Sequence, residues 1–219
     1  MDFGNIAHGL ITWANKPCYD KACIAFPPPS SSPRPKENTS VHVLQNVLNK
    51  VIFAGDERYD TVFVNSQCPP HPGSDMRADL AIKYVTDSGL LHIACFIEAT
   101  GGHRSEDYAI SGVEDQVLDY CEKYFDNNSN TSDFIFAATL VGVHIRLWTV
   151  HKHERKLKAV WGDSGPGAIS DYKDLGDTAA AELIKKTFRD MLETAPEPWI
   201  HRSSASMTSK IINGGTSAV

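Results

Sequence analysis

Apolar residues recur at intervals of three and four in three segments of the chain, which is the spacing of a helix that buries one face. The first predicted helix covers about residues 39–53 and the second about residues 110–125. The third begins at Asp177 or Thr178, both of which are good capping residues. The apolar face expected for this last helix consists of Leu183, Ile184, Phe188, Met191 and Leu192.

Shorter apolar runs predict strands. Two of them, at residues 77–86 and 90–100, are separated by a tight turn and should form an antiparallel hairpin. The second run is apolar on both faces almost to its end, which predicts a central position in the sheet. Residues 65–75 and 163–175 are rich in proline or glycine and are predicted to be loops. Further strands are expected at residues 134–141, 143–150 and 156–161.

This order of elements favours a mixed α/β domain of the α+β type, with a central mixed sheet flanked by helices. The domain is expected to span residues 38–200. A linker at residues 26–37, with five prolines and three serines, separates it from an N-terminal segment at residues 1–25. That segment should pack on the domain, because it would otherwise expose Leu10, Ile11 and Trp13. Residues 201–219 are small and polar and are expected to form a flexible tail.

The amino-acid composition argues against some classes of binding partner. The chain of 219 residues has 21 basic and 27 acidic residues, a net charge of −6, so a broad basic surface for nucleic acid is not indicated. A local basic groove remains open. No segment approaches the length of a membrane span, and no secretory signal is visible, so no membrane association is expected. Five cysteines without such a signal predict reduced thiols and an intracellular location, in the cytoplasm or nucleus.

Two acidic residues stand out by their positions in the predicted hairpin. Asp79 lies at the start of its first strand, and Glu98 lies near the end of the second, inside an apolar run. Counting outward from the turn places the two residues about level, within one residue of register. Two adjacent carboxylates repel each other unless one is protonated or a cation lies between them, and Mg²⁺ or Mn²⁺ favours such oxygen pairs. Exposure of each acid to solvent at a strand end is the simpler alternative.

The segments RADLAI, with Asp79, and IEAT, with Glu98 and Thr100, resemble the core motif of the PD-(D/E)XK nuclease superfamily. Gln116 and Tyr120 in the next helix are similar to the QxxxY feature of its RecB-like branch. The resemblance covers about residues 39–150 and implies a restriction-endonuclease-like core. That core has the order αβββαβ, which the predicted elements match only if a further strand is added or one of them is reassigned. The chain also resembles proteins of filamentous fungi, in segments such as DQVLDYC and VGVHIRLW.

The resemblance implies that Asp79 and Glu98 bind a metal ion, Mg²⁺ or Mn²⁺, and that Gln116 and Tyr120 face the active site. Thr100 occupies the position of the family's catalytic lysine, and a threonine supplies no positive charge. Lys83 is expected on the same strand face as Asp79, but about 13 Å away, which is too far to replace that lysine.

Two further departures concern the start of the motif and the first helix. Ala78 stands where the family motif has proline. The first helix offers Gln45, Asn46 and Asn49 where the family often has a glutamate.

Three hypotheses therefore follow. The first is a metal-dependent phosphodiester hydrolase that acts on nucleic acid with a weakened or altered active site. The second is a catalytically inactive nuclease-like module that binds nucleic acid or a protein partner. The third is a fold with no link to nucleic acid, which the acidic composition allows.

Overall fold

The computed structural model describes residues 5–23, 37–101, 106–128 and 132–195. Within these ranges it has a seven-stranded mixed sheet and four helices, so the predicted fold class is confirmed. The tail at residues 201–219 and nearly all of the linker at residues 26–37 lie outside the described residues. No helix in the described part is long and apolar enough to cross a membrane.

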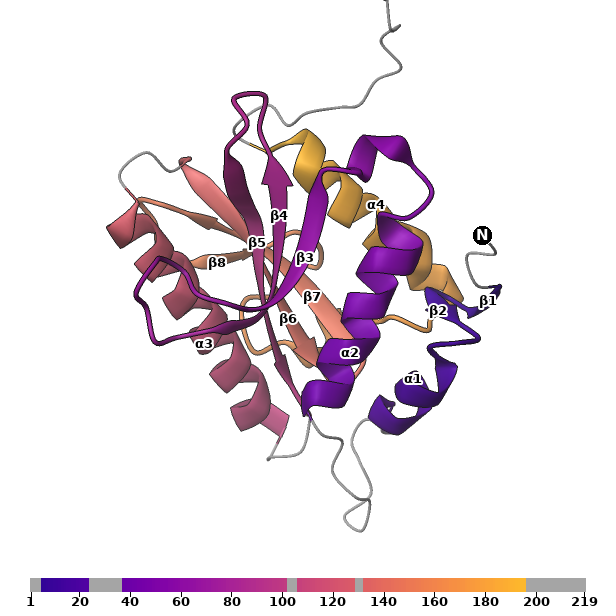
Figure 1. The fold of residues 1–219 in the computed structure, drawn as a ribbon. Helices are drawn as coiled ribbons and strands as arrows, with labels where there is room; N and C mark the ends of the chain where they lie inside the picture. Colours follow the sequence, from indigo (N-terminus) through magenta and orange to yellow (C-terminus); the bar gives the residue numbers. More distant parts are fainter. Residues whose placement is uncertain (1–4, 24–36, 102–105, 129–131, 196–219) are drawn as a thin grey trace, which may run out of the picture.

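The main sheet follows the chain order from one edge to the other (Figure 1). Neighbouring strands are antiparallel except for β5 and β6, which run parallel because a helix connects them. β5 lies between β4 and β6, as its apolar sequence predicts. The strands are β3 (Val62–Cys68), β4 (Ala78–Val85), β5 (Leu91–Thr100), β6 (Phe134–Val141), β7 (His144–His151) and β8 (Leu157–Ala159), with β9 (Lys173–Asp174) paired to β7.

Helices cover both faces of the sheet. α3 (Glu106–Asn127) packs on one face, where Val117 and Cys121 join the same apolar cluster as Phe96 of β5. α2 (Glu37–Val47) and α4 (Thr178–Glu193) pack on the other face (Figure 1). α2 continues directly into a π-helical turn, Leu48–Ile52, so the helix expected at residues 39–53 starts earlier and changes form near its end. Two short 3₁₀ helices, Glu57–Tyr59 and Ile169–Asp171, lie in the connections.

Several sequence predictions about local structure are wrong. Residues 173–174, within the segment 163–175 assigned to a loop, form the short strand β9. Residues 65–68, assigned to a loop, belong to the edge strand β3, whose exposed Asn65, Ser66 and Gln67 hide the apolar pattern of a strand. Leu183, assigned to the buried face of α4, is 41% exposed, whereas Ile184 and Phe188 are buried. With β3 included, the order of elements from α2 to β6 is helix, three strands, helix, strand.

The N-terminal segment packs on the main body. It forms a two-stranded sheet, β1 (Ile6–His8) and β2 (Ile11–Thr12), followed by α1 (Lys16–Ala22). Leu10 and Ile11 are buried in the cluster under α2 and α4, and the Leu10 N–H donates to the Leu175 carbonyl at 2.9 Å. Trp13, however, is 61% exposed and takes no part in this core.

Gly9 makes the tightest approach between this segment and the main body. Its φ is +53°, and a Cβ at this position would lie 2.5 Å from the Gly176 carbonyl carbon. We therefore expect Gly9→Ala to lower the unfolding free energy by about 1–2 kcal/mol through its backbone conformation and by about 1–3 kcal/mol more through the clash.

Urea denaturation would measure this loss, with Gly55→Ala as the matched control. Gly55 also has a positive φ, +74°, but nothing lies within 4 Å of its Cβ position. The control should therefore show only the backbone cost. Equal losses in the two variants would mean that the contact between Gly9 and Gly176 does not resist a side chain.

Candidate functional site

Asp79 and Glu98 lie side by side on adjacent strands. The pairing of Leu80 with Ile97 makes Asp79 level with Glu98, as the count from the hairpin turn predicts. The Ala99 N–H donates to Asp79 Oδ2 at 2.9 Å, and the Asp79 N–H donates to Glu98 Oε2 at 3.4 Å. Each carboxyl therefore uses one oxygen in a main-chain hydrogen bond, which fixes the pair to the backbone of both strands.

Both carboxyls are buried, and burial shifts both of them toward their protonated forms. Asp79 is 7% exposed and Glu98 is 5% exposed. Burial raises the pKa of Asp79 to about 6, although the Ala99 N–H opposes this shift. Burial and the charge of Asp79 raise the pKa of Glu98 to about 8. Ionising both groups at neutral pH is therefore unfavourable unless positive charge is supplied.

No lysine or arginine among the described residues forms an ion pair with either carboxyl. A third acid instead adds to the negative charge. Glu37, in the first turn of α2, raises the pKa of both Asp79 and Glu98. The start of α2 and the C-terminal end of β5 lie at the same end of the strands (Figure 1). The predicted first helix began after Glu37, so the sequence analysis missed this residue, although an acid is a usual residue in a first helical turn.

The raised pKa values of Asp79 and Glu98 make the contribution of this pair to folding stability depend on pH. In the folded protein the pair holds its protons to about pH 6 and pH 8, whereas the ordinary values are 3.8 and 4.5. Between these limits the folded state binds more protons than the unfolded state. The contribution of this pair to the stability of the fold therefore falls as the pH rises from about 4 to 8. A bound cation would reverse this loss by favouring the ionised carboxyls.

α3 places Gln116 and Tyr120 beside the acid pair. Gln116 Nε2 donates to the Tyr120 hydroxyl at 2.9 Å, and this hydroxyl donates to the Arg77 carbonyl, just before β4, at 2.9 Å. Tyr120 is buried, whereas Gln116 is exposed. Burial raises the pKa of Tyr120 to about 12, and the charges of Glu98 and Asp79 act in the same direction. The hydroxyl therefore stays protonated within electrostatic reach of both acids.

Thr100 lies at the end of β5, two residues beyond Glu98 and on the same face of the strand. Its carbonyl accepts the Gly142 N–H at 2.9 Å, which holds the strand end against β6. The side chain is half-buried, so a longer side chain could extend from this position. The structure thus brings all five residues predicted for the site to one region, between the ends of β4 and β5 and the face of α3.

A row of buried polar residues continues from the acid pair across the sheet. Glu98 pairs with Thr139 on β6, and Thr139 pairs with Arg146 on β7. Asp79, Glu98, Thr139 and Arg146 therefore occupy one level of four adjacent strands, on the face that α3 covers. The sequence analysis identified only the two acids, because it did not determine the register between β5 and β6.

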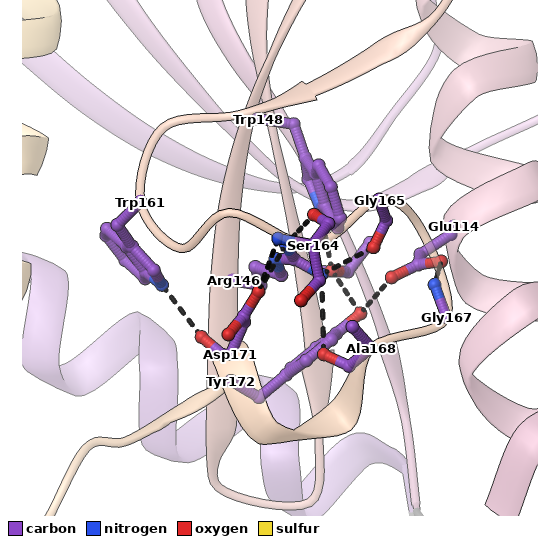
Figure 2. A network of polar contacts seen from close by, with 11 residues as sticks. Glu114, Arg146, Trp148, Trp161, Ser164, Gly165, Gly167, Ala168, Asp171 and Tyr172 are labelled. Atoms are coloured by element: carbon purple, nitrogen blue, oxygen red, sulfur yellow. Dashed lines mark hydrogen bonds and ion pairs between the residues drawn. The ribbon is translucent and has the colours of Figure 1, made fainter.

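Thr139 links this row to α3 through a chain of hydrogen bonds that runs by way of Tyr172 to Glu114. Figure 2 shows Trp148, Tyr172 and Glu114 of this chain. Trp148 Nε1 donates to the Thr139 hydroxyl at 3.0 Å, and this hydroxyl lies 2.7 Å from the Tyr172 hydroxyl. The Tyr172 hydroxyl donates to Glu114 Oε1 at 2.9 Å, while Glu114 Oε2 accepts the Gly167 N–H at 2.7 Å. Glu114 lies two residues before Gln116, so these bonds fix α3 close to the acid pair.

Arg146 holds the loop that carries Tyr172. Its side chain is fully buried, and its Cζ lies 4.2 Å from the centre of the Trp148 ring. Nη2 bonds Asp171 Oδ2 at 2.9 Å, and the two terminal nitrogens together bond three carbonyls (Figure 2). These carbonyls belong to Ser164, Gly165 and Ala168. The guanidinium thus replaces the main-chain partners that this irregular loop lacks.

The residues present suit a hard divalent cation that keeps most of its own water. Among the described residues, no group of three or more His, Cys, Asp or Glu side chains is arranged to hold a metal. Of the carboxylates in the described part of the chain, Asp79 and Glu98 would be the two in direct contact with the ion. Mg²⁺ is commonly bound by one or two carboxylates, with water or phosphate oxygens in its remaining positions.

Comparisons of the chain with protein-family models, with curated proteins and with solved structures found no match.

Proposed function

We propose that Asp79 and Glu98 bind Mg²⁺ or Mn²⁺, and that the protein is a metal-dependent phosphodiester hydrolase that acts on nucleic acid with an altered active site. The observation that carries this proposal is a pair of buried, level carboxyls with no basic partner in the described residues. The order of elements from α2 to β6 supports it, because this is the order of the nuclease core that the sequence resembles. Glu37 supports the proposal as well, because it lies on the helix where the resembled family often has a glutamate and its charge acts on both acids.

Each residue has a distinct task under this proposal. Asp79 and Glu98 would hold the cation, which supplies Lewis acidity and a more acidic water when bound. The Gln116 amide would orient water or a phosphate oxygen by hydrogen bonding. The Tyr120 hydroxyl donates its proton to the Arg77 carbonyl and would act only as an acceptor for a water. Thr100 can position a water through its hydroxyl but cannot neutralise charge that develops on the phosphate.

Metal binding is the first test. We expect calorimetric titration with MnCl₂ or MgCl₂ to show one site in the wild type, and Glu98→Gln to weaken it about tenfold or more. Asp119→Asn is the matched control, because it removes one negative charge from an exposed position on α3. Metal-free Glu98→Gln should also lose less thermal stability between pH 6 and pH 8 than the wild type, since it lacks the titrating carboxyl.

Metal binding that is equal in the wild type and Glu98→Gln, or absent from both, would reject the site. Hydrolysis is then measured on labelled single- and double-stranded DNA and RNA in the presence of Mn²⁺. Cleavage by the wild type that Glu98→Gln abolishes would establish the proposed activity.

Thr100 favours a second candidate function, a catalytically inactive module that binds nucleic acid or a protein. The position two residues beyond Glu98 lacks the positive charge that hydrolysis uses. Metal binding and nucleic-acid binding without cleavage would support this alternative.

A further inference from the structure

A cavity of about 570 Å³ lies at the opposite end of β4 from Asp79. It is open to solvent on one side and is lined by the β3–β4 loop, the hairpin end of β4 and β5, and the end of α3. Figure 1 shows this loop reaching from the sheet toward α3. A volume of this size is typical of sites that hold small organic ligands.

Lysine and histidine side chains line the cavity, and their charged forms are positive. They include Lys83, His71 and His92, and none of the described lining residues is acidic. Lys83 is half-buried on β4, and its ammonium forms no ion pair with any described residue. A partly desolvated ammonium without a counterion favours an anionic ligand, because the ligand supplies the missing charge.

The remaining walls suit a flat ring with polar edges. The Tyr124 ring and the prolines at positions 69, 70 and 72 offer apolar surfaces on which a ring can stack. The side-chain amides of Asn127 and Asn128 donate to the Lys123 and Tyr124 carbonyls at 2.9 and 2.7 Å. Their amide oxygens therefore remain as acceptors for N–H groups on a ring.

We propose that this cavity binds a phosphorylated nucleoside, with the phosphate on Lys83 and the base against Tyr124 and the prolines. The ligand is either a free mononucleotide or the terminal nucleotide of a strand, because both present the same chemistry. The site is separate from the acid pair, since Lys83 lies about 13 Å along β4 from Asp79. It does not require a metal ion, and it can exist whether or not the proposed hydrolase activity does.

The test is calorimetric titration of the full chain in EDTA with AMP, GMP, CMP and UMP. The matching nucleosides, inorganic phosphate and a 5′-phosphorylated tetranucleotide are the comparison ligands. Lys83→Met keeps the length of the side chain and removes its charge, and should weaken nucleotide binding by about tenfold or more. Lys50→Met, at an exposed position in the π-helical turn, should leave binding unchanged.

Tighter binding of a mononucleotide identifies a free nucleotide as the ligand, and tighter binding of the tetranucleotide identifies a strand terminus. Either result supports the site, provided that Lys83→Met reduces the affinity. Absence of nucleotide binding at millimolar concentrations overturns the proposal, as does equal binding by Lys83→Met. Inorganic phosphate that binds as tightly as the nucleotides would reject the stacking surface. Because Glu98→Gln tests the acid pair independently, failure of one site is distinguishable from failure of the other.

Discussion

Replacing Arg146 with alanine should lower the unfolding free energy by about 3–5 kcal/mol, as expected when one partner of a buried ion pair is removed. The side chain is fully buried, and its guanidinium bonds Asp171 and three carbonyls of the loop that follows β8. Its removal leaves the Asp171 carboxylate and the three carbonyls without this partner. It also removes the cation from the face of the Trp148 ring, 4.2 Å away.

Arg155→Ala is the matched control for this prediction. Arg155 also bonds two carbonyls and one aspartate, and its Cζ lies 5.3 Å from the centre of the Phe125 ring. Its ion pair with Asp126 is partly exposed, with 30% of the Arg155 side chain and 62% of the Asp126 side chain accessible, so loss of the pair should cost less than about 1 kcal/mol. The two arginines thus differ mainly in burial, and the difference between the variants measures the effect of burial.

Equilibrium urea denaturation followed by circular dichroism would measure both losses. If Arg146→Ala does not fold, Asp171→Asn provides a milder change, because it removes only the charge of the partner. That variant should lose about 1–3 kcal/mol. Equal stability of the Arg146 and Arg155 variants would contradict the conclusion that the buried guanidinium organises the loop.

The sequence predicted the three helices α2, α3 and α4, the hairpin of β4 and β5, and the paired acids, because each of these has a strong local pattern. The turn at residues 87–89 connects Asp79 and Glu98 through adjacent strands, so their level placement needs only a count of residues. The position of β5 follows in the same way, since a strand that is apolar on both faces needs neighbours on both sides.

The features that the sequence analysis missed depend on contacts between distant segments. β3 is an edge strand, and its exposed polar residues remove the alternation that identifies a half-buried strand. Glu37 was missed because the boundary of a helix is harder to predict than its existence. Thr139 and Arg146 become part of the row only through the register of β5 with β6 and of β6 with β7. The hairpin turn at residues 87–89, which places Asp79 level with Glu98, determines neither of these two registers.

The second large effect is expected at Thr100. If the acid pair binds a metal and the site hydrolyses phosphodiesters, Thr100→Lys should raise the rate of metal-dependent cleavage about 10²–10³-fold. The side chain at this position lies on the same strand face as Glu98, two residues away. Because the position is half-buried, a lysine could extend toward the acid pair and keep part of its stem in contact with the protein.

Two matched variants separate charge from size in this experiment. Thr100→Met introduces a chain of similar length without charge and should leave the rate unchanged. Combining Thr100→Lys with Glu98→Gln should abolish the gain, because the lysine can act only on a phosphate that the metal holds. An ammonium beside two buried carboxyls also favours their ionised forms, so Thr100→Lys should lower the pKa values that burial raises at Asp79 and Glu98. NMR titration of the two carboxyls would measure this change independently of cleavage. A lowered pKa without any gain in cleavage would place the lysine at the site and favour the binding module over the hydrolase.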